Sequence, residues 1–133
     1  GLYRLRLLAQ HLEKLETVPP EKRKRRFNMV AWIQRDYCST AACALGEACF
    51  IPQLRKAGLR YRRYRLAPLN DATACPYIVR KGKMHYGTLA GAILFGINES
   101  VSDGLFLSDG LTNDTPGKVA ALIWQYIGYC KFA

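Results

Sequence analysis

Apolar residues recur at three- and four-residue spacing along the start of the chain. This stripe is made of Leu5, Leu8, Leu12 and Leu15. Polar residues lie off this stripe, so the pattern predicts an amphipathic helix over residues 1–16; they are Arg4, Arg6, Gln10, Glu13 and Lys14. Pro19 and Pro20 follow. Because proline disfavours helical geometry in the residue before it, the helix is expected to end there.

Three later segments also show helical patterns. "IPQLRKAG" predicts a short helix that stops at Gly58, and "TLAGAILFGI" predicts an almost wholly apolar, central buried helix with Thr88 as its cap. In "TPGKVAALIWQYIGY", Thr115 is placed to cap a third helix, and Pro116 takes the first helical position, where its missing N–H costs nothing.

One segment has the pattern of a hairpin. "PYIVRKGKMHYG" carries β-branched and aromatic residues on both sides of Lys81-Gly82, which predicts two strands joined by a turn at these two residues. "NESVSDGLFLSDGLTND", residues 98–114, contains Asp-Gly twice and is expected to be rich in loops. "FNMVAWI" is a short apolar element with the character of either a strand or a helical turn.

The stretch "CSTAACALGEACF", residues 38–50, packs three cysteines among small apolar residues. We interpret it as one closely packed helix capped by Ser39 or Thr40. Gly46 weakens a helix by about 1 kcal/mol relative to alanine, so a glycine here indicates a close approach or a bend. Small side chains would allow the core to assemble around this segment.

These elements together predict an α+β fold that is mainly helical: a single compact domain of about five helices with one small β-hairpin. The expected organisation is an N-terminal helix (1–16), a basic linker (19–26) and a core (27–133). A chain of 133 residues, half of them hydrophobic, is long enough to bury such a core. No apolar run reaches the roughly 18 residues that span a membrane, so no membrane association is expected.

The net charge of +10 is distributed unevenly. Residues 1–65 contain fifteen Lys/Arg and five Asp/Glu, whereas residues 66–133 contain five of each. The excess lies in two basic clusters, and an asymmetry of this size attracts polyanions. The first basic cluster is Lys22, Arg23, Lys24, Arg25 and Arg26. The second basic cluster is Arg55, Lys56, Arg60, Tyr61, Arg62, Arg63, Tyr64 and Arg65.

Both clusters suit nucleic acid. Arginine can contact phosphate with two N–H groups, and tyrosine can stack on bases. Alternatively, the first cluster is a solvated segment, and the second is an edge strand whose charges prevent pairing with other strands. No helix-turn-helix, zinc-finger or RNA-recognition signature is present, so direct reading of base sequence is not expected.

The cysteines allow a different hypothesis. Cys38 at a helix N-terminus would have a stabilised thiolate. A cysteine that opens a helix, followed by a histidine on a later strand, is the order seen in several cysteine hydrolases, and Cys38 and His85 have this order, with Asp71 as a possible third polar partner. Any cysteine followed by a histidine satisfies that order, so we favour a packed thiol and no catalytic residue. The five cysteines are expected to be reduced, because they lie mostly in apolar surroundings. Cys38, Cys43 and Cys49 lack zinc-site spacing, and we predict neither a metal nor a cofactor.

Several motifs, in this order, resemble a loosely defined family of small uncharacterised proteins from bacteriophages and bacteria. They are "FNMVAW", "CSTAACALGEA", "IPQLRKAGL", "LFGI", "DGLF" and "TPGKVAALI". The resemblance covers roughly residues 27–127. In that family the central motif tends to be Cys-Gly-Thr-x-x-Cys-Ala-x-Gly-His-Ala, and a Thr-Pro-x-x-Val-Ala helix ends the chain. Ser39 replaces the usual glycine here, and Glu47 replaces the histidine.

The resemblance implies a phage or prophage origin and a single fold. With the charge asymmetry, it leads to the hypothesis of a non-enzymatic basic accessory protein that binds nucleic acid or a nucleic-acid-associated complex. The alternatives are a protein–protein interaction module with an acidic partner, a virion component, and the hydrolase that uses Cys38 and His85. The expected location is the host cytoplasm or the virion. The sequence does not predict an oligomeric state.

Overall fold

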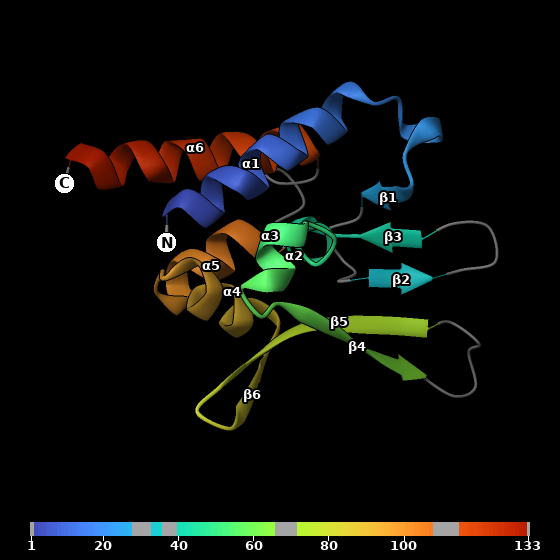
Figure 1. Ribbon diagram of the computed structural model, residues 1–133. Helices are drawn as coiled ribbons and strands as arrows, with labels where there is room; N and C mark the ends of the chain where they lie inside the picture. Colours follow the sequence, from blue (N-terminus) through green and yellow to red (C-terminus); the bar gives the residue numbers. More distant parts are fainter. Residues whose placement is uncertain (1, 28–32, 36–39, 66–71, 108–114, 133) are drawn as a thin grey trace.

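The computed structural model describes residues 2–27, 33–35, 40–65, 72–107 and 115–132 (Figure 1). Its helices are α1 (Leu2–Thr17), the 3-10 helix η1 (Pro20–Lys22), α2 (Ala44–Ala48), α3 (Pro52–Lys56), α4 (Gly87–Phe95), α5 (Glu99–Phe106) and α6 (Pro116–Phe132). Its strands are β1 (Arg25–Phe27), β2 (Ile33–Arg35), β3 (Thr40–Ala42), β4 (Arg60–Arg65), β5 (Ala72–Arg80) and β6 (Lys83–Tyr86). The predicted α+β fold, mainly helical, is confirmed.

The strands form one sheet in the order β1-β3-β2-β5-β4, and β6 pairs with β5. The β1–β3 pair is parallel, and the other pairs are antiparallel. The predicted hairpin is present as β5 and β6, joined by Lys81 and Gly82, which both have positive φ (53° and 77°). Positive φ at both turn residues matches the right-handed twist of the strands. The sheet is therefore larger than the single hairpin that the sequence predicted.

The prediction of one helix over residues 38–50 is wrong. Thr40 belongs to β3, which pairs with β1 on one side and with β2 on the other. The helix α2 begins only after Cys43, whose Sγ accepts a hydrogen bond from the Gly46 N–H at 3.3 Å and so caps the helix. Pairing between distant strands overrides the weak local preference of short, small residues. Ser39 lies outside the described residues.

Residues 99–106 were expected to be loop and instead form α5. Asn98 caps the helix, since its Oδ1 accepts a hydrogen bond from the Val101 N–H at 2.8 Å. Leu105 and Phe106 are buried in the core. This burial stabilises a helix in a segment where the Asp-Gly dipeptide had predicted a turn. The remainder of the predicted loop, residues 108–114, lies outside the described residues.

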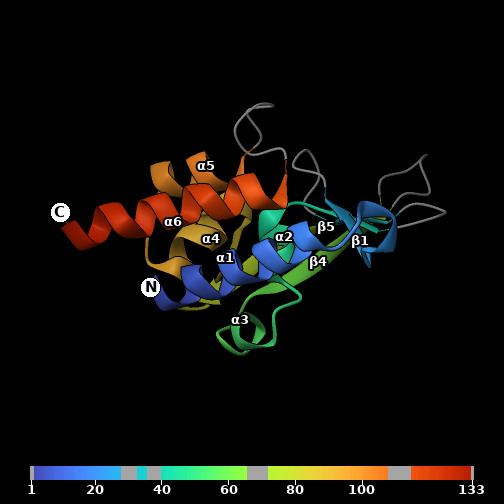
Figure 2. The same cartoon turned by 90° about the horizontal axis from the view of Figure 1, so that it is seen from above.

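The helices gather at one side of the molecule and the sheet at the other (Figures 1 and 2). The helices α1 and α6 lie side by side and run in opposite directions. The Gly117 N–H at the start of α6 donates to Glu16 Oε2 near the end of α1, at 3.2 Å. The leucine stripe of α1 joins one hydrophobic cluster with residues of α2, α4, α5 and α6. The segment 19–26, expected to be a linker, contains η1 and the start of β1.

The predicted caps have different outcomes. Thr115 Oγ1 accepts a hydrogen bond from the Lys118 N–H at 3.2 Å, so its predicted role is confirmed. Thr88 lies inside α4, whose cap position is Tyr86, with no hydrogen bond from its side chain. The short helix α3 ends just before Gly58, as predicted.

Within the described part of the chain, no helix has the length and apolar character needed to cross a membrane.

Candidate functional site

Glu47 is the centre of a charged cluster at the junction of α1, β1 and α2. It lies inside α2, and only 1% of its surface is exposed. A charged side chain is rarely buried so completely unless partners compensate it. The chain supplies those partners from α1, the first helix, and from β1, which follows η1 and pairs with β3 directly before α2.

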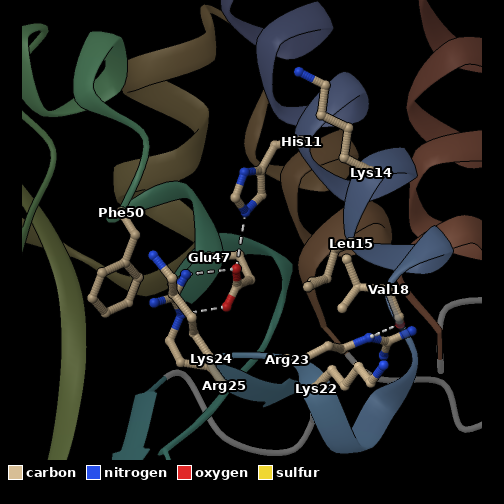
Figure 3. A pocket seen from close by; sticks show the side chains of 10 residues that line it. All are labelled: His11, Lys14, Leu15, Val18, Lys22, Arg23, Lys24, Arg25, Glu47 and Phe50. Carbon is tan, nitrogen blue, oxygen red and sulfur yellow. Dashed lines mark hydrogen bonds and ion pairs between the residues drawn. The ribbon is translucent and has the colours of Figure 1, made fainter.

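Two residues bind the Glu47 carboxylate (Figure 3). Arg25 Nε donates to Oε2 at 2.7 Å, and Arg25 Nη2 donates to Oε1 at 3.0 Å. His11 Nε2 lies 2.9 Å from the same Oε1. Arginine forms this two-point contact because its planar group matches the carboxylate. The cluster therefore ties α1, β1 and α2 together through one buried side chain.

The surroundings of Glu47 favour its ionised form. Burial by itself raises the pKa of this carboxyl group, because it penalises the charge. The hydrogen bonds from His11 and Arg25, together with the positive charge of Arg25, outweigh that effect, so the pKa lies below its ordinary value. Glu47 is consequently a carboxylate at neutral pH, with both oxygens occupied by donors.

Arg25 also begins a row of stacked groups. Its guanidinium carbon lies 3.8 Å from the centre of the Phe50 ring, and Figure 3 shows the group between that ring and Glu47. The Phe50 ring in turn lies 5.6 Å from the ring of Tyr61 in β4, tilted by 34°. Arginine stacks favourably on aromatic faces. Phe50 thereby connects the first basic cluster with the second, although β1 and β4 stand at opposite ends of the strand order.

A pocket of 530 Å³ opens beside this cluster. His11 and Glu47 line it, together with apolar side chains of Leu15, Val18 and Phe50. The rest of its lining is basic: Lys14, Lys22, Arg23, Lys24 and Arg25. In Figure 3 the carboxylate and the imidazole face Leu15 of α1 and Val18, which directly follows α1, across the hollow. Such a volume falls within the range of small-ligand sites, about 300–1,000 Å³.

The basic residues of the pocket differ in how they are engaged. Arg25 is neutralised by Glu47. Arg23 Nε donates to the Val18 carbonyl at 3.0 Å, and its Nη2 lies 3.8 Å from Glu16. The exposed residues Lys14, Lys22 and Lys24 have no ion-pair partner among the described residues. The pocket thus carries an excess of positive charge that the described part of the chain does not compensate.

The structure separates the predicted site residues into two groups. Lys22, Arg23, Lys24 and Arg25 of the first basic cluster line the pocket. In the second cluster, Arg55 and Lys56 end α3, and residues 60–65 form β4 at one end of the strand order, where the alternative interpretation had placed an edge strand. The side chains of Arg26, Arg63, Tyr64 and Arg65 lie outside the described residues.

The described side chains of β4 have their own contacts. Arg60 Nη1 donates to the carbonyl of Leu59 at 2.9 Å and to that of Arg55. Tyr61 is partly buried against the core and against Phe50. Arg62 is exposed and also engaged in an interaction. These residues present charge along the strand while their backbone completes the pairing with β5.

The structure describes only one of the three residues of the hydrolase alternative. Cys38 and Asp71 lie outside the described residues, and His85 is a partly buried residue of β6 opposite Ile78. Among the described thiols, burial raises the pKa of Cys43 to about 12 and also raises the pKa of Cys49. The described residues include no group of three or more His, Cys, Asp or Glu arranged to hold a metal ion.

Sequence reasoning had not assigned His11, Lys14, Glu47 or Phe50 to a site. One signal could have indicated Glu47: it is the single charged residue in the small, apolar stretch from 38 to 50. A charge in such a place requires a partner. The identity of that partner follows only from the packing of α1 and β1 around α2.

In comparisons with protein-family models, curated proteins and solved structures, the chain has no match.

Proposed function

We propose that this protein binds nucleic acid, or a complex that contains it, through phosphate contacts and without reading base sequence. The observation that carries the proposal is the basic pocket. Lys14, Lys22 and Lys24 surround it without partners among the described residues, and its one carboxylate is already neutralised. Amines in this state gain most from nucleic acid, because each phosphate that they neutralise releases cations condensed on the strand.

The row formed by Arg25, Phe50 and Tyr61 extends this surface. It leads from the pocket to β4, where further arginines follow. Basic residues interleaved with aromatic rings are typical of grooves that follow a single strand, since rings tolerate any base and arginine contacts the backbone. A strand bound in the pocket could continue along this row. In keeping with the family resemblance, the protein would act in a host cytoplasm or on a virion.

Salt-dependent binding of labelled single-stranded oligonucleotides tests the proposal. The variant carries Lys14→Ala, Lys22→Ala and Lys24→Ala, and the matched control carries Lys81→Ala, Lys83→Ala and Lys131→Ala. Both remove three charges, but only the first set lines the pocket. Each lost phosphate contact should reduce the slope of log K against log salt by about 0.7. We expect a slope reduced by about 2 in the pocket variant and a smaller change in the control.

Two results would contradict the proposal. Either the wild-type protein binds no oligonucleotide at low salt, or the two triple variants weaken binding equally. The second result would mean that binding follows net charge alone. Purification without nuclease gives an independent check, because nucleic acid that co-purifies and leaves with a high-salt wash raises the 260/280 nm absorbance ratio.

A second candidate function is binding of an acidic protein, and the β5–β6 hairpin favours it. Tyr77 pairs with Tyr86 and Val79 pairs with Met84, so these four side chains share one face of the hairpin. Three of them are exposed: Val79 (47%), Met84 (39%) and Tyr86 (36%). Arg80, Lys81 and Lys83 add positive charge at the tip. Exposed apolar groups rimmed by charge are typical of protein interfaces.

A variant with Val79→Ser and Met84→Ser separates the two candidates. If the hairpin binds an acidic protein partner, this variant loses a complex that the wild type forms in host lysate, while its affinity for oligonucleotides is unchanged. A complex that survives in the variant would exclude the hairpin as the interface.

A further inference from the structure

We propose that the basic pocket receives a terminal phosphate, the phosphomonoester at one end of a nucleic-acid strand, so that the protein recognises strand ends. This inference rests on the proposed function and makes it more specific. It follows from three features of the pocket: the number of unpaired amines, the state of its carboxylate, and the way in which the chain surrounds it.

The number of amines exceeds what one internal phosphate requires. An internal phosphodiester carries one negative charge, whereas a phosphomonoester carries about −1.5 to −2 at pH 7. Lys14, Lys22 and Lys24 contribute three positive charges around one hollow, and no described residue compensates them in an ion pair. A doubly charged group matches this excess better than a single internal phosphate does.

The groups around Glu47 in the pocket are compatible with a bound anion. Glu47 accepts hydrogen bonds at both of its oxygens, so it presents no free carboxylate that would repel phosphate. Arg25 uses Nε and Nη2 on Glu47, which leaves Nη1 without a partner among the described residues. His11 similarly uses Nε2 and keeps Nδ1. The buried carboxylate therefore fixes the remaining Arg25 donor in place before a ligand arrives, whereas His11 Nδ1 donates only when the imidazole is protonated.

The chain encloses the pocket on several sides. The end of α1 supplies one wall, the turn through η1 into β1 supplies the next, and α2 with Phe50 supplies the third (Figure 3). A strand that passes through a site requires two exits, whereas a strand that ends there requires only one. The apolar side chains of Leu15, Val18 and Phe50 can cover the terminal sugar or base. The volume of 530 Å³ is suitable for one nucleotide and not for several.

The experiment measures the affinity of the full chain for three oligonucleotides of the same sequence, by fluorescence anisotropy at constant salt. One has a 5′-phosphate, one has a 3′-phosphate, and one has hydroxyl groups at both ends; each carries its dye at an internal base. We expect one phosphorylated form to bind at least tenfold more tightly than the unphosphorylated strand. In the Lys22→Ala, Lys24→Ala double variant the affinity for every strand should fall, because both residues line the pocket, and the three strands should then bind equally.

The control variant, Lys81→Ala with Lys83→Ala, should keep the preference. The preferred phosphorylated end identifies which end the pocket receives. Equal affinity for all three strands would overturn end recognition and leave the proposed function intact. Absence of binding to every strand would overturn both. A preference that persists in the pocket double variant would show that another site recognises the end, and would also exclude this inference.

Discussion

Glu47 of α2 and Arg25 of β1 form a buried two-point ion pair, although 22 residues separate them in the chain. The arginine donates to both carboxylate oxygens with the edge of its guanidinium group and stacks on the Phe50 ring with the face of that group. Replacement of a complete buried pair by apolar residues is often neutral, but removal of one partner leaves an uncompensated charge. The pair thus fixes the position of β1 beside α2, and with it the position of the basic pocket.

Glu47→Gln should destabilise the fold by about 3 kcal/mol, because Arg25 would remain charged in a partly buried position without its counter-ion. The free energy of unfolding in urea measures the effect. Glu21→Gln is the matched control, since Glu21 is exposed in η1, and its unfolding free energy should change by less than about 0.5 kcal/mol.

A double variant tests whether the cost is the unpaired charge. Arg25→Met combined with Glu47→Leu should recover most of the stability that Glu47→Gln loses, since no buried charge remains. Equal destabilisation in the double variant would indicate that packing around the pair, and not its charge, maintains the junction.

The ion pair should also govern stability in acid. Because the pKa of Glu47 is lower in the folded protein than in the unfolded chain, its contribution is fully present above the ordinary carboxyl pKa. That contribution is lost as the pH falls through the lower, folded-state value. Thermal unfolding between pH 7 and pH 2.5 should therefore show a steep loss in the wild type and a shallower one in Glu47→Gln. Parallel curves for the two proteins would assign acid sensitivity to other carboxylates.

The close approach of α4 and α5 depends on Gly91. A Cβ atom at this position would lie 3.0 Å from Ser102 Oγ and 3.2 Å from the Phe106 ring. Because Ser102 donates its hydroxyl hydrogen to the Thr88 carbonyl, it is not free to move away. Gly91→Ala should thus cost about 1–3 kcal/mol in the free energy of unfolding.

Gly104 provides the matched control within α5. Nothing lies within 4 Å of a Cβ atom built there. Gly104→Ala should therefore stabilise the helix by about 0.4–1 kcal/mol, because alanine restricts the unfolded chain. The two alanine variants are expected to have opposite signs in chemical denaturation, and two effects of the same sign would contradict the packing at Gly91.

How much of this structure could be predicted depends on the range of the interactions. The stripe of Leu5, Leu8 and Leu12 lies within one helix, and the Lys81-Gly82 turn joins adjacent strands, so both were predictable from local patterns. The strand at Thr40 was not, because its small residues carry no alternation and its two neighbours in the sheet are β1 and β2. Local sequence held no sign of that pairing.

The candidate site divides in the same way. Lys22 and Arg25 were predicted as polyanion contacts because they belong to a run of basic residues. His11 and Glu47 are 36 residues apart and meet only because α1 packs near α2. The sequence drew attention to Glu47 only through the proposed motif resemblance, from which a histidine would be expected at this position. That a histidine of α1 binds it follows from the fold alone.

The thiols allow a last prediction, which also tests the hydrolase alternative. Cys43 and Cys49 are buried, and burial raises the pKa of Cys43 to about 12, so about 10⁻⁴ of it is thiolate at pH 8. Because the thiolate is the reactive form, both should resist iodoacetamide in the native protein and react only after unfolding. Peptide mass spectrometry at timed intervals measures each site separately. Rapid and selective labelling of Cys38 would favour a nucleophile there, whereas labelling of Cys38 no faster than a free cysteine in a peptide would remove the basis for the hydrolase.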